Sequence, residues 1–159
     1  MRRPWLALVA AGCASALPIV VGCHRAEGAA PAVLALTIRV DDTLAFHPNR
    51  IECRPGQVIR LRLANAIPAG GPELPHNLVL FQPGTDVEAF GQAAVAAEPQ
   101  HGYIPDGYTT AVLFASELVQ PSRQVEITLR APERSGVYPF ACSFPGHCLM
   151  GMTGQLVVN

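Results

Sequence analysis

Cys142-Ser-Phe-Pro-Gly-His147-Cys148-Leu-Met150-Gly-Met152-Thr-Gly154, near the end of the 159-residue chain, carries the strongest chemical pattern of the sequence. It places a thiol, an imidazole and two thioethers within eleven residues, from Cys142 to Met152. Sulfur ligands select copper(I), and imidazole also suits copper, whereas magnesium, calcium and manganese prefer oxygen ligands. The stretch therefore predicts a copper-type metal site.

Two predicted strands flank this stretch. Residues 137–141 before it and residues 155–158 after it are rich in apolar and β-branched side chains, which is typical of strands. Between them, Pro145-Gly146 predicts a turn. The chain would then double back, with Cys142 at the end of one strand, His147 on the turn and a methionine at the start of the next strand. All three side chains would point to one place.

A second histidine would complete the set of two histidines, one cysteine and a weak axial methionine that marks a blue-copper electron-transfer site. His76 stands in Pro75-His76-Asn77, immediately before the apolar segment 78–81, which predicts a strand. The Pro- and Gly-rich loop 67–75 would bring His76 to the same end of the fold as His147. The other histidines are predicted to lie in a linker, a hairpin and a surface loop: His24, His47 and His101.

Together these segments resemble the cupredoxin family and are similar to azurin, auracyanin and plastocyanin. The matching features are His76-Asn77 before a hydrophobic strand and Cys142-x₄-His147 followed by Met-x-Gly-x-Leu. The resemblance covers roughly residues 33–159. It implies one type 1 copper per chain, held by His76, Cys142, His147 and a methionine, and a function in one-electron transfer.

The resemblance also assigns a role to neighbours of the ligands. It implies that the Asn77 side chain ties its loop to the loop that starts at Ser143. From the chemistry of the site we further expect Phe144 in the apolar shell around the Cys142 sulfur. Such neighbours orient metal ligands and tune the metal.

Two methionines compete for the axial position. Met150 and Met152 share the same strand parity, so alternation does not separate them. The register Met152-Thr-Gly154-Gln-Leu156 matches the Met-x-Gly-x-Leu of the family. We therefore expect Met152 to be the axial ligand and Met150 to be part of a hydrophobic rim, with Met150 as the alternative ligand.

The remaining pattern predicts an all-β fold. Apolar residues alternate with polar ones in residues 58–64, where Arg60 and Arg62 face solvent, as in an antiparallel sheet with one wet side. The Ala-rich segment 86–98, which ends before Pro99, predicts the one helix. Further strands are predicted in residues 33–40, 110–115 and 123–130. These elements predict a Greek-key β-sandwich, cupredoxin-like, of about seven or eight strands with one short helical flap.

Two cysteines remain outside the predicted site and the N-terminal segment. Cys53 precedes the Pro55-Gly56 turn, at the end of the fold opposite to Cys148, so no disulfide between them is expected. Cys53 is interpreted as a small core hydrophobe. Cys148, beside His147, is expected to be a half-exposed thiol.

The N-terminal segment predicts export. Residues 1–22 combine Arg2-Arg3 with an apolar run, which is typical of a signal peptide. The run ends Val20-Val21-Gly22-Cys23, which resembles a bacterial lipobox with Cys23 as the lipidated residue. An ordinary signal peptide cut nearby, or a cysteine in an uncleaved anchor, is the alternative. We predict residues 23–32 as a tether and residues 33–159 as the cupredoxin domain. The protein would lie at the periplasmic face of a bacterial membrane, or be soluble in the periplasm without lipidation.

Composition and charge exclude other function classes. The formal net charge is −1, which does not indicate binding to nucleic acid. All eleven basic residues are Arg. A copper enzyme would need a second metal centre and an open coordination position, and the leftover histidines are scattered. No nucleophile–base pair, phosphate-binding loop or carboxylate pair is evident in the sequence. The sequence therefore predicts an electron carrier and not an enzyme, with copper storage or delivery as the alternative.

The predicted carrier would be a monomer that exchanges electrons with redox protein partners through the face around His147. Six small or apolar residues should form a collar where the His147 edge meets solvent. Few charges around this collar would suit a brief encounter that buries little area. The collar residues are Gly70, Gly71, Leu74, Pro145, Leu149 and Met150.

Overall fold

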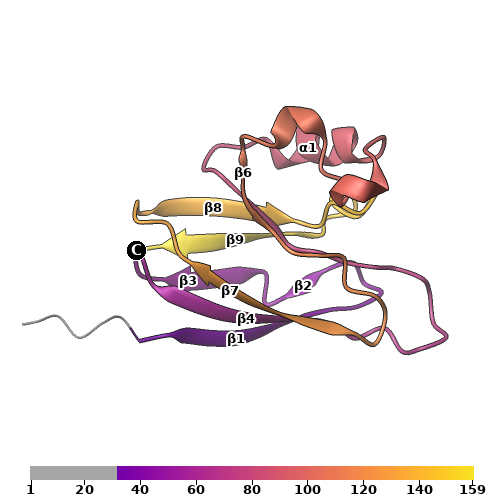
Figure 1. The fold of residues 1–159 in the computed structure, drawn as a ribbon, viewed down its shortest axis with the longest axis horizontal. Helices are drawn as coiled ribbons and strands as arrows, with labels where there is room; N and C mark the ends of the chain where they lie inside the picture. Colours follow the sequence, from indigo (N-terminus) through magenta and orange to yellow (C-terminus); the bar gives the residue numbers. More distant parts are fainter. Residues whose placement is uncertain (1–31) are drawn as a thin grey trace, which may run out of the picture.

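Nine strands in two sheets, together with one helix, make up residues 32–159, the part of the chain that the computed structural model describes (Figure 1). The strands are β1 (Leu34–Val40), β2 (Phe46–His47), β3 (Arg50–Cys53), β4 (Val58–Asn65), β5 (Val79–Phe81), β6 (Val112–Ala115), β7 (Gln124–Arg130), β8 (Gly136–Ala141) and β9 (Thr153–Val158). Between β5 and β6 lie the helix α1 (Val87–Ala94) and two 3₁₀ turns, Pro99–His101 and Asp106–Tyr108.

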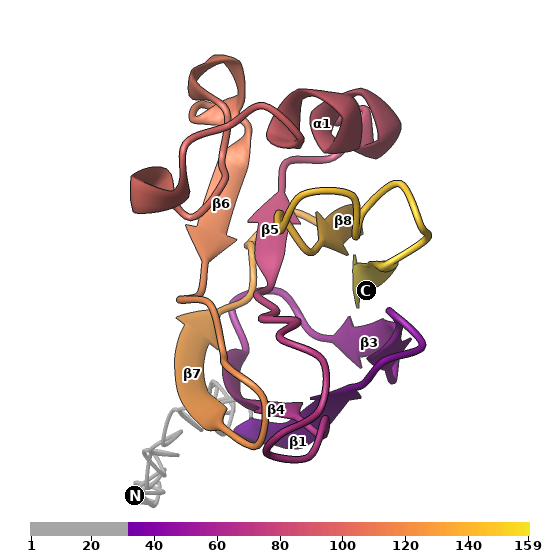
Figure 2. The same cartoon turned by 90° about the vertical axis from the view of Figure 1, so that its right-hand side faces the viewer.

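The strand order confirms the predicted β-sandwich. One sheet has the order β2-β1-β4-β7 and the other the order β3-β9-β8-β5-β6. Strands β1 and β4 pair in parallel, as do β3 and β9, so neighbours in each sheet come from distant parts of the chain. The two sheets face each other, and β6 and β7 form edges on the same side of the sandwich (Figure 2).

The core follows the alternation seen in the sequence. In β4, Ile59, Leu61 and Leu63 are buried, while Arg60 and Arg62 are exposed. Buried side chains of both sheets form one main cluster between them. Burying one such aliphatic side chain stabilises a fold by about 1.5–3 kcal/mol, so this inner layer supplies most of the driving force for folding.

The strand count exceeds the expected seven or eight because the segment around Pro48-Asn49 forms two short strands. β2 pairs with β1, and β3 runs parallel to β9, with Ile51 opposite Leu156. Phe46 of β2 and Ile51 of β3 are both buried. A four-residue strand whose partner lies about a hundred residues away leaves no local pattern that distinguishes it from a loop.

The predicted helix over residues 86–98 is present but shorter. Asp86 is its N-cap, and the carboxylate accepts a hydrogen bond from the backbone N–H of Ala89 at 3.0 Å. After Ala94 the chain continues in tighter turns. Glu98 is extended because Pro99 disfavours a helical conformation in the residue before it.

The helix packs on the outer face of the second sheet, above β8 in Figure 1. Phe90 is fully buried and contacts Phe81 edge-on, with ring centroids 4.7 Å apart. These side chains belong to a second hydrophobic cluster that also contains Ala141 and Cys148. The helical flap therefore lies outside the sandwich, and it covers the loop after Cys142.

The two remaining cysteines are separate free thiols in the described part of the chain. Cys53 pairs with Val158 at the far end of β9 and lies in the main core. The expectation that Cys148 is half-exposed is wrong. Cys148 is only 6% exposed, and its thiol donates to the carbonyl of Val87. The helix covers it at Gly91, where an added Cβ would lie 3.0 Å from its sulfur.

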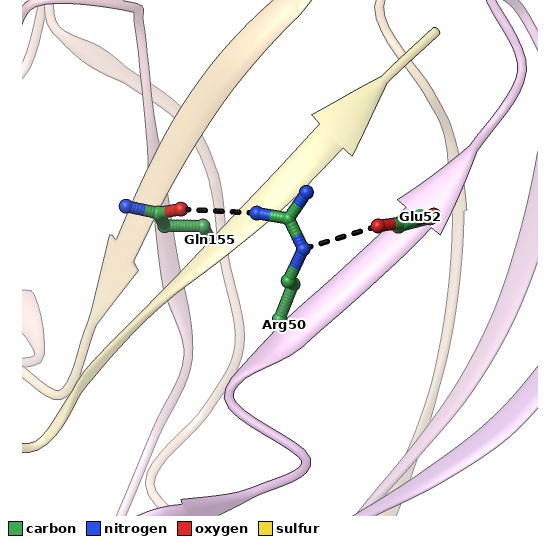
Figure 3. Close-up of polar contacts among 3 residues, drawn as sticks. All are labelled: Arg50, Glu52 and Gln155. Atoms are coloured by element: carbon green, nitrogen blue, oxygen red, sulfur yellow. Dashed lines mark hydrogen bonds and ion pairs between the residues drawn. The ribbon is translucent and has the colours of Figure 1, made fainter.

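On the outer surface of β3 and β9, Arg50 forms a small polar cluster (Figure 3). Its guanidinium lies 3.1 Å from a Glu52 carboxylate oxygen and 3.5 Å from the Gln155 amide oxygen. Both partners of the ion pair are more than half exposed, so the pair stabilises the fold by about 0–1 kcal/mol. It neutralises Arg50 locally without anchoring the sheet.

Gly154 fills a position where no other residue fits. An added Cβ would lie 2.3 Å from the Phe140 ring and 2.4 Å from the Asn49 carbonyl oxygen. Gly154→Ala should therefore lower the free energy of unfolding by about 3 kcal/mol, the upper part of the range for overpacking, as measured by denaturant titration. Gly136→Ala is the matched control, since its Cβ would meet nothing closer than 3.7 Å. Equal stability of the two variants would contradict this packing argument.

The predicted signal peptide 1–22, the predicted lipidation site Cys23 and nearly all of the predicted tether 23–32 lie outside the described residues. Within residues 32–159, no helix is both long enough and apolar enough to cross a membrane.

Candidate metal centre

His76 enters the site from the loop between β4 and β5. Its backbone N–H donates to Val119 at 3.1 Å and its carbonyl accepts from the same residue at 2.7 Å, so a two-sided bridge fixes the loop. The Asn65 side-chain amide donates to the carbonyls of Leu74 and Val119, which ties both sides of this bridge to the end of β4. The His76 side chain is fully buried.

Cys142 and His147 come from the loop between β8 and β9. The turn at Pro145-Gly146 is present, with Gly146 at a φ of 84°, where glycine is favoured. The His147 backbone N–H donates to Phe144, and its carbonyl accepts from Met152 at 3.0 Å. These bonds close the loop on itself and direct the two ligand candidates inward.

The three predicted donors meet. The ligand atoms of His76, Cys142 and His147 all lie within 4.8 Å of one another, and all three side chains are buried. The Cys142 sulfur lies 3.5 Å from the His147 Nδ1, and the two imidazole centroids are 4.9 Å apart. The sequence prediction of one convergent His–Cys–His group therefore agrees with the structure.

The chemistry of this group fits a metal ion. Neither His76 nitrogen has a hydrogen-bond partner, although both are buried. A buried polar atom without a hydrogen-bond partner destabilises a fold by about 1–3 kcal/mol. A metal ion at the centre of the group would give a His76 nitrogen the partner that it lacks. One thiol and two imidazoles are a donor set that suits copper.

Burial sets the protonation of these donors. Desolvation, together with the neighbouring His147, lowers the pKa of His76 to about 4. Desolvation lowers the pKa of His147 to about 4 as well. Both imidazoles are therefore neutral at pH 7, the form that binds metal. Burial raises the pKa of the Cys142 thiol to about 11, although backbone N–H groups of Asn77 and Phe144 oppose the rise by hydrogen bonding to the sulfur.

These shifts predict how the stability of the metal-free protein depends on pH. Below pH 6.5 the unfolded imidazoles of His76 and His147 bind protons that the folded ones refuse until about pH 4. Stability should therefore fall as the pH drops from 6.5 toward 4, by at most about 1.4 kcal/mol per pH unit and histidine.

At alkaline pH the stability changes with pH in the opposite direction. The folded Cys142 and Cys148 thiols keep their protons to about pH 11, whereas unfolded thiols lose them near pH 9.0. Stability should fall as the pH rises from 9 to 11. Urea titrations of the metal-free protein should show maximal stability between about pH 6.5 and 9, and a maximum below pH 5 would contradict the prediction.

Asn77 links the two ligand loops. Its side-chain oxygen accepts a hydrogen bond from the Ser143 backbone N–H at 2.9 Å, and its amide donates to the Ser143 hydroxyl at 2.8 Å. Both residues are buried. The residue after His76 is thus bonded to the residue after Cys142, which sets the distance between the two donors.

The methionines differ sharply in burial. Met152 is fully buried in the main core, and its carbonyl accepts from the Cys142 backbone N–H at 3.2 Å. Met150 is 71% exposed. The sequence register and the burial favour the same residue, Met152, for the axial position.

Aromatic packing around the site includes residues that the sequence analysis missed. Phe144 packs on the His147 ring, with centroids 4.6 Å apart, and Tyr103 packs edge-on against Phe144. The Ser143 hydroxyl also donates to the Gly102 carbonyl. The segment after the helix therefore closes the site from outside. Asn65, Gly102 and Tyr103 belong to no local motif, so only their contacts reveal their part.

The predicted collar reaches the surface, but His147 scarcely does. Leu149 and Met150 are the large exposed apolar residues of this loop, at 47% and 71% exposure. Gly70 is exposed, and Gly71, Leu74 and Pro145 are half-buried. His147 itself is 3% exposed, so the expected solvent-facing edge is a narrow one.

Comparison with protein families matches residues 32–159 to the copper binding proteins of the plastocyanin/azurin family. The chain belongs to this family. The cupredoxin resemblance seen in the sequence is thereby confirmed, and the His–Cys–His group is consistent with one copper site per chain.

The similar proteins include auracyanins. Auracyanin-B of Chloroflexus aurantiacus is 32% identical over 118 residues, which cover 74% of this chain and 48% of that protein, so the match spans about half its length. The copper-resistant cuproprotein CopI of Rubrivivax gelatinosus is 28% identical over 85% of this chain and 72% of that protein. The structure of auracyanin A, a "blue" copper protein of Chloroflexus aurantiacus, superposes with a TM-score of 0.67 at 29% identity, covering 80% of this chain and all of that chain.

Proposed function

We propose that this member of the plastocyanin/azurin family is a one-electron carrier with a single type 1 copper. His76, Cys142 and His147 would be its ligands, and Met152 its weak axial ligand. Copper supplies a one-electron couple when bound, and its potential depends on the axial ligand and on the surroundings of the cysteine sulfur. The chain would act as a carrier and not as an enzyme.

The observation that carries the proposal is the convergence of three buried donors, His76, Cys142 and His147, from two loops that are bonded to each other. The Asn77–Ser143 hydrogen bonds tie the two ligand loops to each other. A site held in this way changes little between copper(II) and copper(I), which is what fast electron exchange needs. The burial of His76 and His147 also supports a carrier, because it limits the access of a substrate to the metal.

Outer neighbours would tune the site. The backbone N–H groups of Asn77 and Phe144 stabilise the thiolate form of Cys142. Phe144 excludes water from one side of His147. Hydrogen bonds to a ligating sulfur and the apolar shell around it set a reduction potential, so Asn77, Ser143 and Phe144 are proposed as tuning residues.

Copper storage or delivery is the second candidate. It is favoured by the similarity to a protein named as a copper-resistant cuproprotein. A storage or delivery site must release its metal, whereas a carrier must retain it through many redox cycles. The two candidates therefore differ in how the oxidised protein behaves.

Visible absorption and voltammetry of the copper-loaded protein distinguish them. We expect intense thiolate-to-copper absorption in the oxidised form and a reversible one-electron couple without loss of metal. A colourless copper(II) complex would refute the blue-copper assignment. A coloured complex that loses its copper on each reduction would instead favour delivery.

We further propose that electrons pass to protein partners through the face around His147, where Leu149 and Met150 are exposed. Leu149→Glu would then slow electron exchange with the partner and leave the absorption spectrum unchanged. If the rate of electron exchange did not change, the collar would only seal the site from water and would not bind the partner.

We also propose export and lipidation at Cys23. Gln57 binds the carbonyl of Ala32 at the end of the domain remote from the copper donors, so a tether would leave the copper end directed away from the membrane. Cys23→Ser should release the protein into the soluble periplasmic or secreted fraction with an unchanged copper spectrum. A wild-type protein that is already soluble would overturn the anchor.

A further inference from the structure

A groove of about 610 Å³ lies on the side of the sandwich where its sheets end. Its walls come from β6, the edge of one sheet, and from β7, the edge of the other, which lie on the same side in Figure 2. Leu113, Phe114 and Leu129 give it an apolar surface, and Tyr138 lines it from β8. Its volume lies within the range of small-molecule sites, and it uses none of the copper donors.

Two arginines line one part of the groove. The Arg130 guanidinium donates to the Gly56 carbonyl at 2.8 Å, which fixes its position, and the Tyr138 hydroxyl donates to the Arg134 carbonyl at 2.7 Å. Within residues 32–159, neither guanidinium has a carboxylate at ion-pair distance. Glu133, between them in the sequence, lies against Gly56 and is not part of the lining. An apolar groove with two unpaired arginines matches a long-chain anion.

The charges of the domain are segregated. Arg50 pairs with Glu52 (Figure 3), and Arg62 pairs with Glu126, so these four are locally neutral. Apart from Glu133, the other acids lie in the loops near the copper donors or in the segment 82–111: Asp41, Asp42, Glu73, Asp86, Glu88, Glu98, Asp106 and Glu117. At the β3–β4 and β7–β8 turns, the three arginines Arg54, Arg130 and Arg134 outnumber the one acid, Glu133.

The described chain begins beside this groove. Leu34 of β1 and Leu129 of β7 both pair with Ile59 of β4, so they lie two strand spacings apart, about 10 Å. Gln57 holds the Ala32 carbonyl at 2.6 Å and accepts at its own carbonyl from Ala131, in the turn that follows β7. A membrane that holds the preceding residues would therefore lie near the groove.

We propose that this groove binds an anionic phospholipid of the membrane, with one acyl chain along Leu113, Phe114 and Leu129 and the phosphate between Arg130 and Arg134. Arginine pairs phosphate bidentately, and a basic surface is attracted to anionic leaflets. The contact orients the domain with its copper end toward the solution. The site does not involve the copper ligands, so its test is independent of the electron-transfer proposal.

Hydrogen exchange of the copper-loaded full chain, mixed with phosphatidylglycerol or phosphatidylcholine vesicles, tests the site. Exchange of the backbone amides of residues 112–115 and 128–134 should slow at least tenfold with phosphatidylglycerol and not with phosphatidylcholine. The double variant Arg130→Gln/Arg134→Gln should lose this protection. So should Leu113→Asp, which places a negative charge in the groove at a side chain already 46% exposed.

Arg50→Gln is the matched control. It removes one arginine from β3, at the opposite edge of the same sheet as β6, and should keep full protection. All variants share residues 1–31, so any membrane contact of that segment is the same in each of them. An unchanged copper spectrum verifies that each variant is folded. Equal protection with both lipids, or equal loss in Arg50→Gln, would overturn the proposal.

Discussion

Replacing Cys142 with serine should abolish the intense visible absorption of the copper-loaded protein. The band requires a thiolate on the metal, and a hydroxyl does not replace it. Copper affinity should fall by more than about a hundredfold, because the loss of an outer neighbour alone already costs 10–100-fold. The metal-free variant should remain folded, since serine is smaller than the cysteine that it replaces and can keep the polar contact with His147.

Cys53→Ser is the control for this experiment. Cys53 is also a buried thiol, 5% exposed, but it lies at the other end of the sandwich beside Val158. The control should keep the absorption band while it loses some stability. Absorption that survives Cys142→Ser, or that disappears in Cys53→Ser, would show that the ligand assignment is wrong. Absorption spectra and competition with a copper chelator provide both measurements.

Met152→Ala should have the largest effect on stability among the site variants. Met152 is fully buried in the main core, and truncation of such a side chain to alanine costs about 2–5 kcal/mol. The same truncation at Met150, which is 71% exposed, should change the free energy of unfolding by less than about 0.5 kcal/mol. Denaturant titration of the two metal-free variants compares packing at the two positions directly.

Leucine variants separate packing from ligation. Met152→Leu nearly conserves volume and should cost less than about 1.5 kcal/mol, yet it removes the sulfur. In the copper-loaded protein it should shift the reduction potential and alter the spectrum, since the axial ligand tunes both. Met150→Leu should leave both unchanged. If Met150→Leu shifted the potential and Met152→Leu did not, Met150 would be the ligand despite its exposure.

The loops that carry the metal donors are held by hydrogen bonds from residues distant in the sequence. Val119 bonds to the His76 backbone, and Asn65 in turn donates to the Val119 carbonyl. The Cys142 loop is held by Asn77 and, through Ser143, by Gly102. Each of these partners is distant in sequence from the ligand that it positions. Variants of Asn65 should therefore affect the copper site even though Asn65 lies outside every ligand motif.

The sequence by itself determined the three donors that meet, His76, Cys142 and His147, together with the turn between Cys142 and His147 and the main strands. Soft donors at short spacing, a Pro-Gly turn and period-two alternation are local patterns, and local patterns can be seen without a fold. The burial of Cys148 could not be predicted from the sequence, because it depends on how α1 packs against the loop after Cys142. The pairing of β3 with β9 and the groove between β6 and β7 were also decided only by the tertiary structure. Backbone hydrogen bonds and buried contacts between distant segments leave no trace in the sequence of either segment alone.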